Sequence, residues 1–227
     1  MKMNTNKVLK FLKRVNLRSV YLNFKLFPIK IAFKFPLLVS RRTLISKFSP
    51  NSIDFDCEVI PGLIQIGYGN LSVFDYKRSR SVLEITGKII VRGHVRIGHG
   101  SKIIVTKKGL LDLGNNFMVN SESTIIATNK ITIKNDVLLS WDILIMDDDL
   151  HQIIDNDSLV HINKSKEIVI NEHVWIGARS MILKGSSIPS NVIIAANAIV
   201  TNSLSESNAI YGGNPVKILK RNVSWEH

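Results

Sequence analysis

A six-residue period in the C-terminal half of the chain is the feature that most restricts its fold. Large β-branched aliphatic residues recur at steps of six, at Ile170, Ile176, Ile182, Ile188, Ile194 and Val200. Six such hits in one register have a chance probability on the order of 10⁻³. The period is therefore a structural repeat and not a coincidence of composition.

A second, compact residue follows each of the first five large residues by four positions. These residues are Val174, Ser180, Ser186, Val192 and Ala198. A six-residue unit cannot bury its own apolar side, so such units must stack on one another, and a short strand with a turn every six residues coils into a parallel solenoid. Looser copies of the unit occur upstream, as in Val91/Val95 and Ile133/Val137. The sequence predicts an all-β solenoid.

The repeat is interrupted once, between Ile145 and Ile170. This interval does not fit the six-residue period, and residues 149–167 are polar and non-periodic, which predicts a loop ejected from the coil. The loop begins beside the acidic cluster Asp147, Asp148 and Asp149, followed by His151. We divide the chain into a basic N-terminal arm (1–58), a β-helix with the ejected loop (59–205) and a C-terminal extension (206–227).

The positive charge of the 227-residue chain is concentrated at its start. The net charge is +12, and residues 1–50 hold twelve Lys or Arg and no acidic residue. The remainder is balanced, which argues against a nucleic-acid-binding body. Apolar residues between Met1 and Phe24 follow a helical spacing with basic residues between them. Such a helix either lies on an anionic membrane or packs on the main domain, and we expect residues 1–40 to make any membrane contact.

Cysteine content and hydropathy indicate the compartment. Cys57 is the single cysteine, which excludes an intrachain disulfide and suits a reducing environment. No apolar run approaches the roughly 18 residues of a spanning helix, and basic residues interrupt the start too often for a signal peptide. We expect a cytoplasmic protein, with the inner face of the membrane as its peripheral location.

Five segments in fixed order resemble the hexapeptide-repeat acyltransferases, in particular galactoside and maltose acetyltransferases and polysaccharide O-acetyltransferases. They are NNFMVN (115–120), SWDILIMDDDLH (140–151), VWIGARSMILKGSSI (174–188), VIIAANAIVT (192–201) and GGNPVK (212–217). The resemblance implies a left-handed parallel β-helix and a homotrimer in which a saccharide acceptor and acetyl-CoA meet between subunits. It implies no metal.

The same resemblance assigns roles to individual residues. His151 matches the catalytic base, which Asp149 or Asp147 would orient, and imidazole suits removal of a hydroxyl proton near neutral pH. An acceptor contact is implied for Asn120. Trp141 would either stack on the acceptor sugar or contact a neighbouring subunit, and we assign Asp147 to the acceptor as well. Contacts with acetyl-CoA are implied for Trp175, Ala178, Ala195, Thr201, Asn202, Lys217 and Lys220. The predicted function is acetyl transfer to a sugar hydroxyl of a bacterial surface polysaccharide or its precursor, and amino-sugar N-acetylation is the alternative.

Two other classes of function compete with this interpretation. His94 and His99 have the H-x4-H spacing of solenoid zinc hydratases, but no third ligand is found one coil earlier, and three protein ligands are usual. Two surface histidines suffice to explain this spacing. A non-enzymatic scaffold or ice-binding solenoid is disfavoured, because the loop at His151 breaks the regular rows that such a surface needs.

Overall fold

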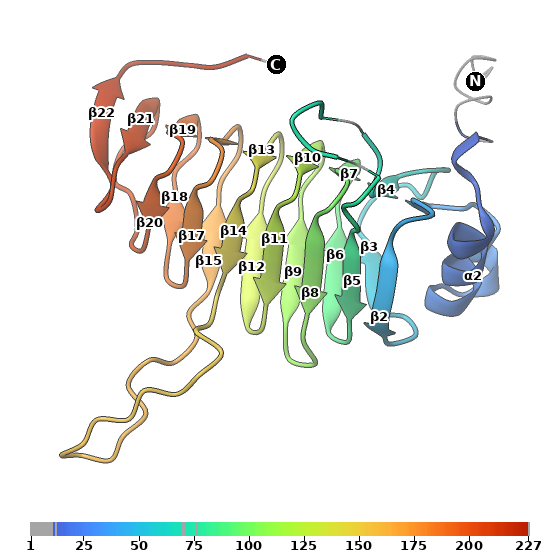
Figure 1. Cartoon of the computed structure of the whole chain (residues 1–227), viewed down its shortest axis with the longest axis horizontal. Helices are drawn as coiled ribbons and strands as arrows, with labels where there is room; N and C mark the ends of the chain where they lie inside the picture. Colours follow the sequence, from blue (N-terminus) through green and yellow to red (C-terminus); the bar gives the residue numbers. More distant parts are fainter. Residues whose placement is uncertain (1–10, 12, 70, 76, 227) are drawn as a thin grey trace.

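The chain coils into a three-sided prism of parallel strands (Figure 1). A computed structural model describes residues 11, 13–69, 71–75 and 77–226. Strands one coil apart pair in parallel and in register, so that Val119 pairs with Leu139 and Leu139 pairs with Ile176. Each face of the prism is therefore one continuous sheet.

From β1 to β20 the strands belong to the three sheets in strict rotation, and β21 and the antiparallel β22 extend sheet A. Sheet A contains β1 (Leu37–Val39), β4 (Ile64–Ile66), β7 (Val95–Ile97), β10 (Phe117–Ser121), β13 (Leu138–Trp141), β16 (Trp175–Ile176), β19 (Val192–Ile194), β21 (Ala209–Gly212) and β22 (Lys217–Arg221). Sheet B contains β2 (Leu44–Phe48), β5 (Val82–Ile85), β8 (Lys102–Val105), β11 (Thr124–Ala127), β14 (Leu144–Met146), β17 (Met181–Leu183) and β20 (Ile199–Val200). Sheet C contains β3 (Ile53–Phe55), β6 (Lys88–Val91), β9 (Leu110–Leu113), β12 (Lys130–Ile133), β15 (Ile168–Ile170) and β18 (Ser187–Ile188).

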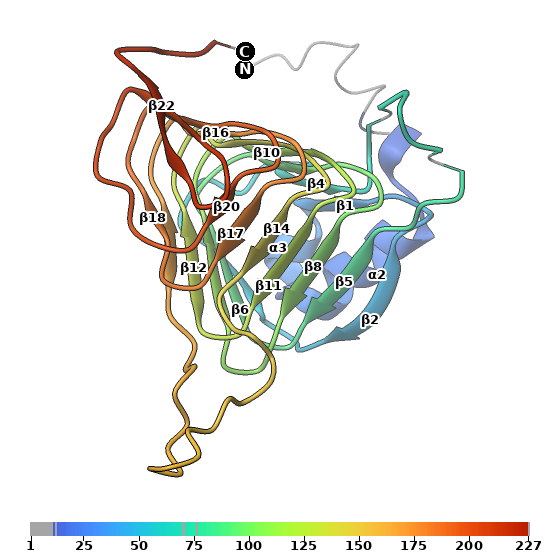
Figure 2. The ribbon, with the colours of Figure 1, turned by 60° about the vertical axis from the view of Figure 1, so that its left-hand side comes forward.

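The coil is left-handed, as the resemblance implies. Figure 2 brings the C-terminal end forward, and each turn there passes clockwise from sheet A through sheet B to sheet C while the chain advances towards the viewer. A path that turns clockwise as it approaches is left-handed. The predicted fold class, a left-handed parallel β-helix with one protruding loop and a partly helical N-terminal segment, is confirmed.

The six-residue period forms the core. All six large residues from Ile170 to Val200 are 0% exposed, and the five compact residues between them are buried as well. The turns follow the same period, because a left-handed backbone conformation recurs at steps of six, at His173, Arg179, Gly185, Asn191 and Asn197. Asn and Gly adopt that conformation at low cost, which is why they separate the aliphatic runs.

Two short helices close the N-terminal end of the prism (Figure 1). They are α2 (Leu17–Leu26) and α3 (Ile29–Ala32). Leu22 and Leu26 are buried on the coil, and the buried Asn23 amide donates to the Leu37 carbonyl at 2.7 Å and accepts from its N–H at 3.2 Å. Helix α2 therefore packs on the domain, and Asn23 satisfies the backbone N–H and carbonyl of Leu37 on the first strand. Of the amphipathic pattern, residues 1–10 and 12 lie outside the described residues.

The β-helix begins inside the segment 1–58, which the sequence predicts to be an arm that precedes it. Strands β1, β2 and β3 pair with β4, β5 and β6, so a complete turn of the β-helix lies within residues 37–55. The segment Phe27–Pro36, which precedes the first strand, contains α3. The first coil has long connections and no six-residue register, so the period could not reveal it. No helix in the described part of the chain has the length and apolarity needed to span a membrane.

Substitution of an inward residue tests the role of the period. Ile170→Ala removes a fully buried side chain from β15, and we expect a loss of about 2–4 kcal/mol in unfolding free energy. Val169→Ala, one residue earlier on the outward side of the same strand, should cost less than about 1 kcal/mol. Urea denaturation followed by circular dichroism measures both, and equal losses would contradict the inward register.

Candidate active site

Four of the predicted site residues lie along the edge where sheet A turns into sheet B. Val119, Leu139, Ile176 and Ile194 are in register, so the residues that follow them stack on one another, and Asn120 is followed along the edge by Ser140, Gly177 and Ala195. Trp141 pairs with Ser121 and lies level with Ala178. This row, the A–B edge, brings Asn120, Trp141, Ala178 and Ala195 together on one side of the prism.

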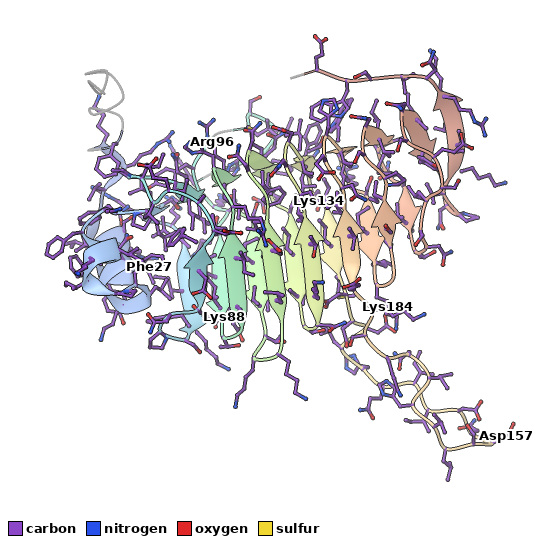
Figure 3. The ribbon with its side chains drawn as sticks, turned by 180° about the vertical axis from the view of Figure 1, so that it is seen from behind. Phe27, Lys88, Arg96, Lys134, Asp157 and Lys184 are labelled. Carbon is purple, nitrogen blue, oxygen red and sulfur yellow. The ribbon has the colours of Figure 1, made fainter. Side chains whose placement is uncertain are left out.

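The ejected loop leaves from a different edge, where sheet B turns into sheet C. It runs between β14 and β15 and extends away from the prism to a tip near Asp157 (Figure 3). Asp147 anchors its root and is 0% exposed. Its carboxylate accepts from the N–H and hydroxyl of Thr128 at 2.8 and 2.9 Å and from the N–H of Asn129 at 2.9 Å. We expected Asp147 to contact the acceptor, but it is a buried structural brace.

Asp149 is fixed by a lysine from the next coil. Lys184 Nζ donates to Asp149 Oδ2 at 2.5 Å and to the Asn163 carbonyl at 2.8 Å. Asn163 Nδ2 donates to the same Asp149 oxygen at 2.7 Å and to the His151 carbonyl at 2.8 Å. The hydrogen bond from Lys184, followed by that from Asn163, lowers the pKa of the Asp149 carboxyl. The loop root is thereby clamped on both sides of His151.

His151 is held by its backbone and presents its ring to solvent. The residue is exposed, and its imidazole has no hydrogen bond or ion pair with any described residue. The carboxylates of Asp147 and Asp149 bind other groups, so in the single chain neither orients the ring as we expected. The geometry leaves both ring nitrogens of His151 available to a ligand or to another chain.

The loop is more apolar at its surface than its sequence suggested. Six large hydrophobic residues in it are 43–77% exposed: Leu150, Ile153, Ile154, Leu159, Val160 and Ile162. The segment forms a narrow hairpin. Ile154 and His161 make a β-bridge, and the Ile162 N–H donates to the Ile153 carbonyl at 3.0 Å. A hairpin that exposes this much apolar surface has the character of a contact surface.

The remaining predicted residues occupy the C-terminal end of the prism. Ile145, Ile182 and Val200 are in register, so Thr201 and Asn202 lie on the same edge as the loop root, one coil beyond Leu183 and Lys184. Lys217 and Lys220 are exposed on β22. They share one face of the β21–β22 hairpin.

A bulge in the hairpin creates that shared face. Lys217 pairs with Gly212 and Lys220 with Ile210, while Leu219 has no partner in the ladder. Residues three apart normally lie on opposite faces of a strand, and the extra residue reverses this. The two ammonium groups therefore project on the same side, as a pair of cations binding one polyanionic group requires.

The Trp175 indole is positioned from both sides. Its Nε1 donates to Ser140 Oγ at 3.0 Å, and the ring centroid of Trp225 lies 6.2 Å away. Trp225 also stacks on His173 at 4.7 Å between centroids and donates from Nε1 to the His173 carbonyl at 3.0 Å. The C-terminal tail thus returns along sheet A and covers the VWIG segment (Figure 1). No pattern in the sequence indicates this contact.

A single chain does not bring the predicted residues into one pocket. Asn120, Trp141, Ala178 and Ala195 lie on the A–B edge, whereas His151, Asp149, Thr201 and Asn202 lie on the B–C edge. Sheet B separates the two edges by its strand length, roughly 10–13 Å for three or four residues. Lys184 and Asn163 complete the loop root, and we overlooked Lys184 although it stands within a motif that we had identified.

The zinc interpretation gains no support from the geometry. No group of three His, Cys, Asp or Glu side chains among the described residues lies close enough to hold a metal. His94 is exposed, but His99 is only 5% exposed, so the expectation of two surface histidines is wrong for His99.

Comparison with known proteins shows which enzymes the chain is similar to. No family model matches the sequence. The chain is 26% identical over 206 residues to an uncharacterised 24.8 kDa protein in the cps region of Klebsiella pneumoniae, covering 90% of this chain and 87% of that protein. It is 33% identical over 135 residues, 60% of this chain, to the polysialic acid O-acetyltransferase of Escherichia coli O1:K1 / APEC. The sequence is thus similar to named bacterial O-acetyltransferases.

The match to the polysialic acid enzyme is partial. The chain spans 41% of the length of that enzyme. The solved structure of the polysialic acid O-acetyltransferase OatWY is 24% identical and has a TM-score of 0.46, covering 84% of this chain and 87% of that one.

The loop-root clamp of this acyltransferase is testable by proteolysis. Lys184→Gln removes the ion pair with Asp149, and we expect faster tryptic cleavage at Lys164 and Lys166 at pH 8 with little change in melting temperature. The control is Lys134→Gln, which removes an exposed ion pair with Glu172 on sheet C. Equal cleavage rates in the two variants would contradict the clamp.

The same clamp has a defined pH dependence. A lowered pKa means that Asp149 stays ionised, so the clamp persists above the ordinary carboxyl value of 3.8 and is lost only as pH falls below it. Hydrogen exchange of the loop root should therefore be protected equally at pH 5 and pH 7, after correction for intrinsic rates. A loss of protection between these values would contradict the assignment.

Proposed function

We propose that the protein transfers acetyl from acetyl-CoA to a hydroxyl of a bacterial surface polysaccharide or its precursor. The observation that carries the proposal is His151, presented with a free imidazole at a clamped loop root on a hexapeptide-repeat coil. Relatives support it by name, because two are polysialic acid O-acetyltransferases and one is a lipopolysaccharide biosynthesis O-acetyl transferase.

His151 acts as general base in this proposal. Its neutral imidazole accepts the proton of the acceptor hydroxyl as that oxygen attacks the thioester carbonyl, and then delivers the proton to the leaving thiolate. Asp149 is committed to Lys184 and Asn163, so it fixes the backbone around His151 and does not orient the ring. Asn120 and Trp141 contact the acceptor, since an amide binds hydroxyls and an indole stacks on a sugar face.

The acetyl-CoA groove follows the C-terminal coils. Ala178 and Ala195 leave room along the A–B edge, and Trp175 supplies an aromatic wall held by Ser140. Thr201 and Asn202 contact the chain of the cofactor further along. Lys217 and Lys220, on one face of the hairpin, bind the nucleotide phosphates. The small and basic residues present fit this ligand without a metal.

A homotrimer assembles the two edges into one site. Sheet B carries an outward apolar row of Ile104, Ile126, Met146 and Leu183. The outward side of sheet C carries ion pairs instead, such as Lys88–Asp54 and Arg92–Asp112. This asymmetry favours sheet B and the apolar loop as the surfaces that meet a neighbouring copy. In that arrangement His151 of one copy faces Asn120 of the next.

A substrate screen tests the function. The intact protein is incubated with acetyl-CoA and neutral, acidic and amino sugars, nucleotide sugars and surface glycans, and thiol release is measured. Mass spectrometry then locates the acetyl group, and hydroxylamine distinguishes an ester from an amide. An ester supports the proposal. An amide product overturns it. The proposal is also overturned if no acceptor raises thiol release above the rate of acetyl-CoA hydrolysis.

Replacement of the base tests the mechanism. His151→Ala should lower kcat by about 10²–10⁴ and leave the KM for acetyl-CoA nearly unchanged, because the ring acts on the acceptor proton. His94→Ala removes an exposed histidine elsewhere and should retain full turnover. Retention of full turnover by the His151 variant would refute the role of this histidine.

The N-terminal segment supports peripheral membrane binding. Helix α2 buries Leu22 and Leu26 and directs Leu17, Tyr21 and Phe24 outward, with Leu17 88% exposed. Phe24 contacts Phe33 at 5.2 Å between centroids, and Ile29 in the same segment is also exposed. Lys25, Lys30 and Lys34 of this segment are exposed as well. A segment that exposes aromatic, aliphatic and basic side chains together suits an anionic bilayer surface, where a lipid-linked saccharide would lie.

Vesicle binding tests this location. The variant Leu17→Gln/Phe33→Gln should lose cosedimentation with phosphatidylglycerol–phosphatidylcholine vesicles and keep its melting temperature, since both residues are exposed. Val73→Gln, also exposed, is the control. Deletion of residues 1–40 is unsuitable, because it removes β1 and uncovers the core. Absence of vesicle binding by the intact chain would refute the membrane role.

A further inference from the structure

A basic pocket lies on the A–B edge at the N-terminal end, away from the ejected loop. It is a cavity of about 290 Å³ between the N-terminal segment and the turns that follow β1, β4 and β7. Its walls meet those of a neighbouring groove at Arg14 and Tyr68, and that groove includes Asn120. The pocket therefore lies beside the residue that we assign to the acceptor.

Four cations of the described residues line the pocket, and two of them have no partner in the part of the chain that the structure describes. Arg14 lies 5.0 Å above the Tyr68 ring, and Arg42 donates to the Lys77 carbonyl. Lys13 and Arg41 have no hydrogen bond or ion pair with any residue that the structure describes. Positive charge that is gathered in a cavity and left without a counter-ion favours an anionic ligand.

The inner wall holds polar atoms that lack partners. Ser79 Oγ, Ser81 Oγ and His99 Nε2 are buried and form no hydrogen bond with the described residues. Ser81 is 2% exposed and His99 5% exposed. Buried polar groups almost always have a partner, and leaving one without costs about 1–3 kcal/mol. Three such atoms in one cavity indicate a ligand that supplies the missing bonds.

The hydrogen bond at His99 Nδ1 determines whether Nε2 of the same ring is a donor or an acceptor. Ser121 Oγ lies 3.1 Å from His99 Nδ1 and donates its single hydrogen to the Asn120 carbonyl at 2.6 Å. The hydroxyl oxygen is therefore the acceptor, and His99 Nδ1 carries the proton. In the neutral ring, Nε2 is then an acceptor, which needs a donor such as a sugar hydroxyl.

The carboxylates of Asp75 and Glu122 do not neutralise Lys13 and Arg41. Asp75 accepts from Lys77 N–H at 2.9 Å and pairs with Arg78 at 3.7 Å, so it is already engaged. Glu122 approaches the pocket wall at Gly100, where a Cβ would lie 2.0 Å from its carboxylate oxygen. Glu122 can accept from a hydroxyl but repels an anion, which directs the charge of a ligand towards Lys13 and Arg41.

We propose that this pocket binds an acidic sugar residue of the acceptor, with its carboxylate or phosphate on Lys13 and Arg41 and its hydroxyls on Ser79, Ser81 and His99. The inference rests on the proposed saccharide acceptor and narrows its chemical class to an anionic glycan. No covalent step is involved. The pocket would hold the acceptor chain at a point beside Asn120 and thereby select for charge.

Direct binding without acetyl-CoA tests the pocket separately from the reaction. Calorimetry with the full chain compares digalacturonate, glucose 1-phosphate and neutral maltose at low ionic strength. We expect at least one acid to bind more than about 10-fold tighter than maltose, and salt to weaken it. The preferred acid identifies carboxylate or phosphate as the charged group. Equal affinity for all three, or binding by none, overturns the proposal.

Two matched sets of variants complete the test. Lys13→Gln/Arg41→Gln should weaken the preferred acid by more than about 10-fold, whereas Lys47→Gln/Lys108→Gln removes two exposed charges elsewhere and should not. Ser81→Ala deletes a hydroxyl without a partner, so it should weaken binding and leave the melting temperature unchanged or higher. Unchanged affinity in the cationic variant, or a lower melting temperature with unchanged affinity in Ser81→Ala, overturns the assignment.

Failure of this inference and failure of the proposed function remain distinguishable. Thiol release with neutral sugars equal to that with acidic sugars overturns the pocket and leaves acetyl transfer standing. Acid binding that the cationic variant abolishes supports the pocket even where no thiol is released.

Discussion

Burial of one large aliphatic residue in every six is the constraint on which the structure depends. A strand of two to four residues cannot exclude water alone, so each unit is stable only when Ile170, Ile176 and their equivalents stack on units above and below. The stacking also fixes the register between coils. Residues that follow equivalent core positions consequently line up, coil after coil, along an edge of the prism.

The residues to which we assign the chemistry lie along these edges. A residue inserted after a core position projects from an edge without disturbing the sheets, as the loop does between β14 and β15. The buried carboxylate of Asp147 closes the coil at that point by bonding to Thr128 and Asn129 one coil earlier. Lys184 then ties the exposed root to the next coil, and His151 is held where the loop leaves the protein.

The sequence predicted the parts of this arrangement that repeat. The period from Ile170 to Val200 was sufficient for the core, and the broken register at Ile145 was sufficient for the loop. It did not separate Asp147 from Asp149, because the burial of Asp147 depends on its hydrogen bonds to Thr128 and Asn129, one coil earlier. Nor did it reveal the first coil or the basic pocket, where Lys13, Ser81 and His99 meet through tertiary packing. Such long-range contacts leave no local pattern.

The central claim is that neighbouring copies share the active site, with His151 from one and Asn120 from the next. Subunit mixing tests this most directly. His151→Ala and Asn120→Ala chains, each inactive alone, are unfolded, combined in equal amounts and refolded, and native mass spectrometry verifies mixed trimers. Random assembly leaves about one site in four with both residues intact, so the mixture should recover about a quarter of wild-type activity. Mixed trimers with no recovered activity would contradict a shared site.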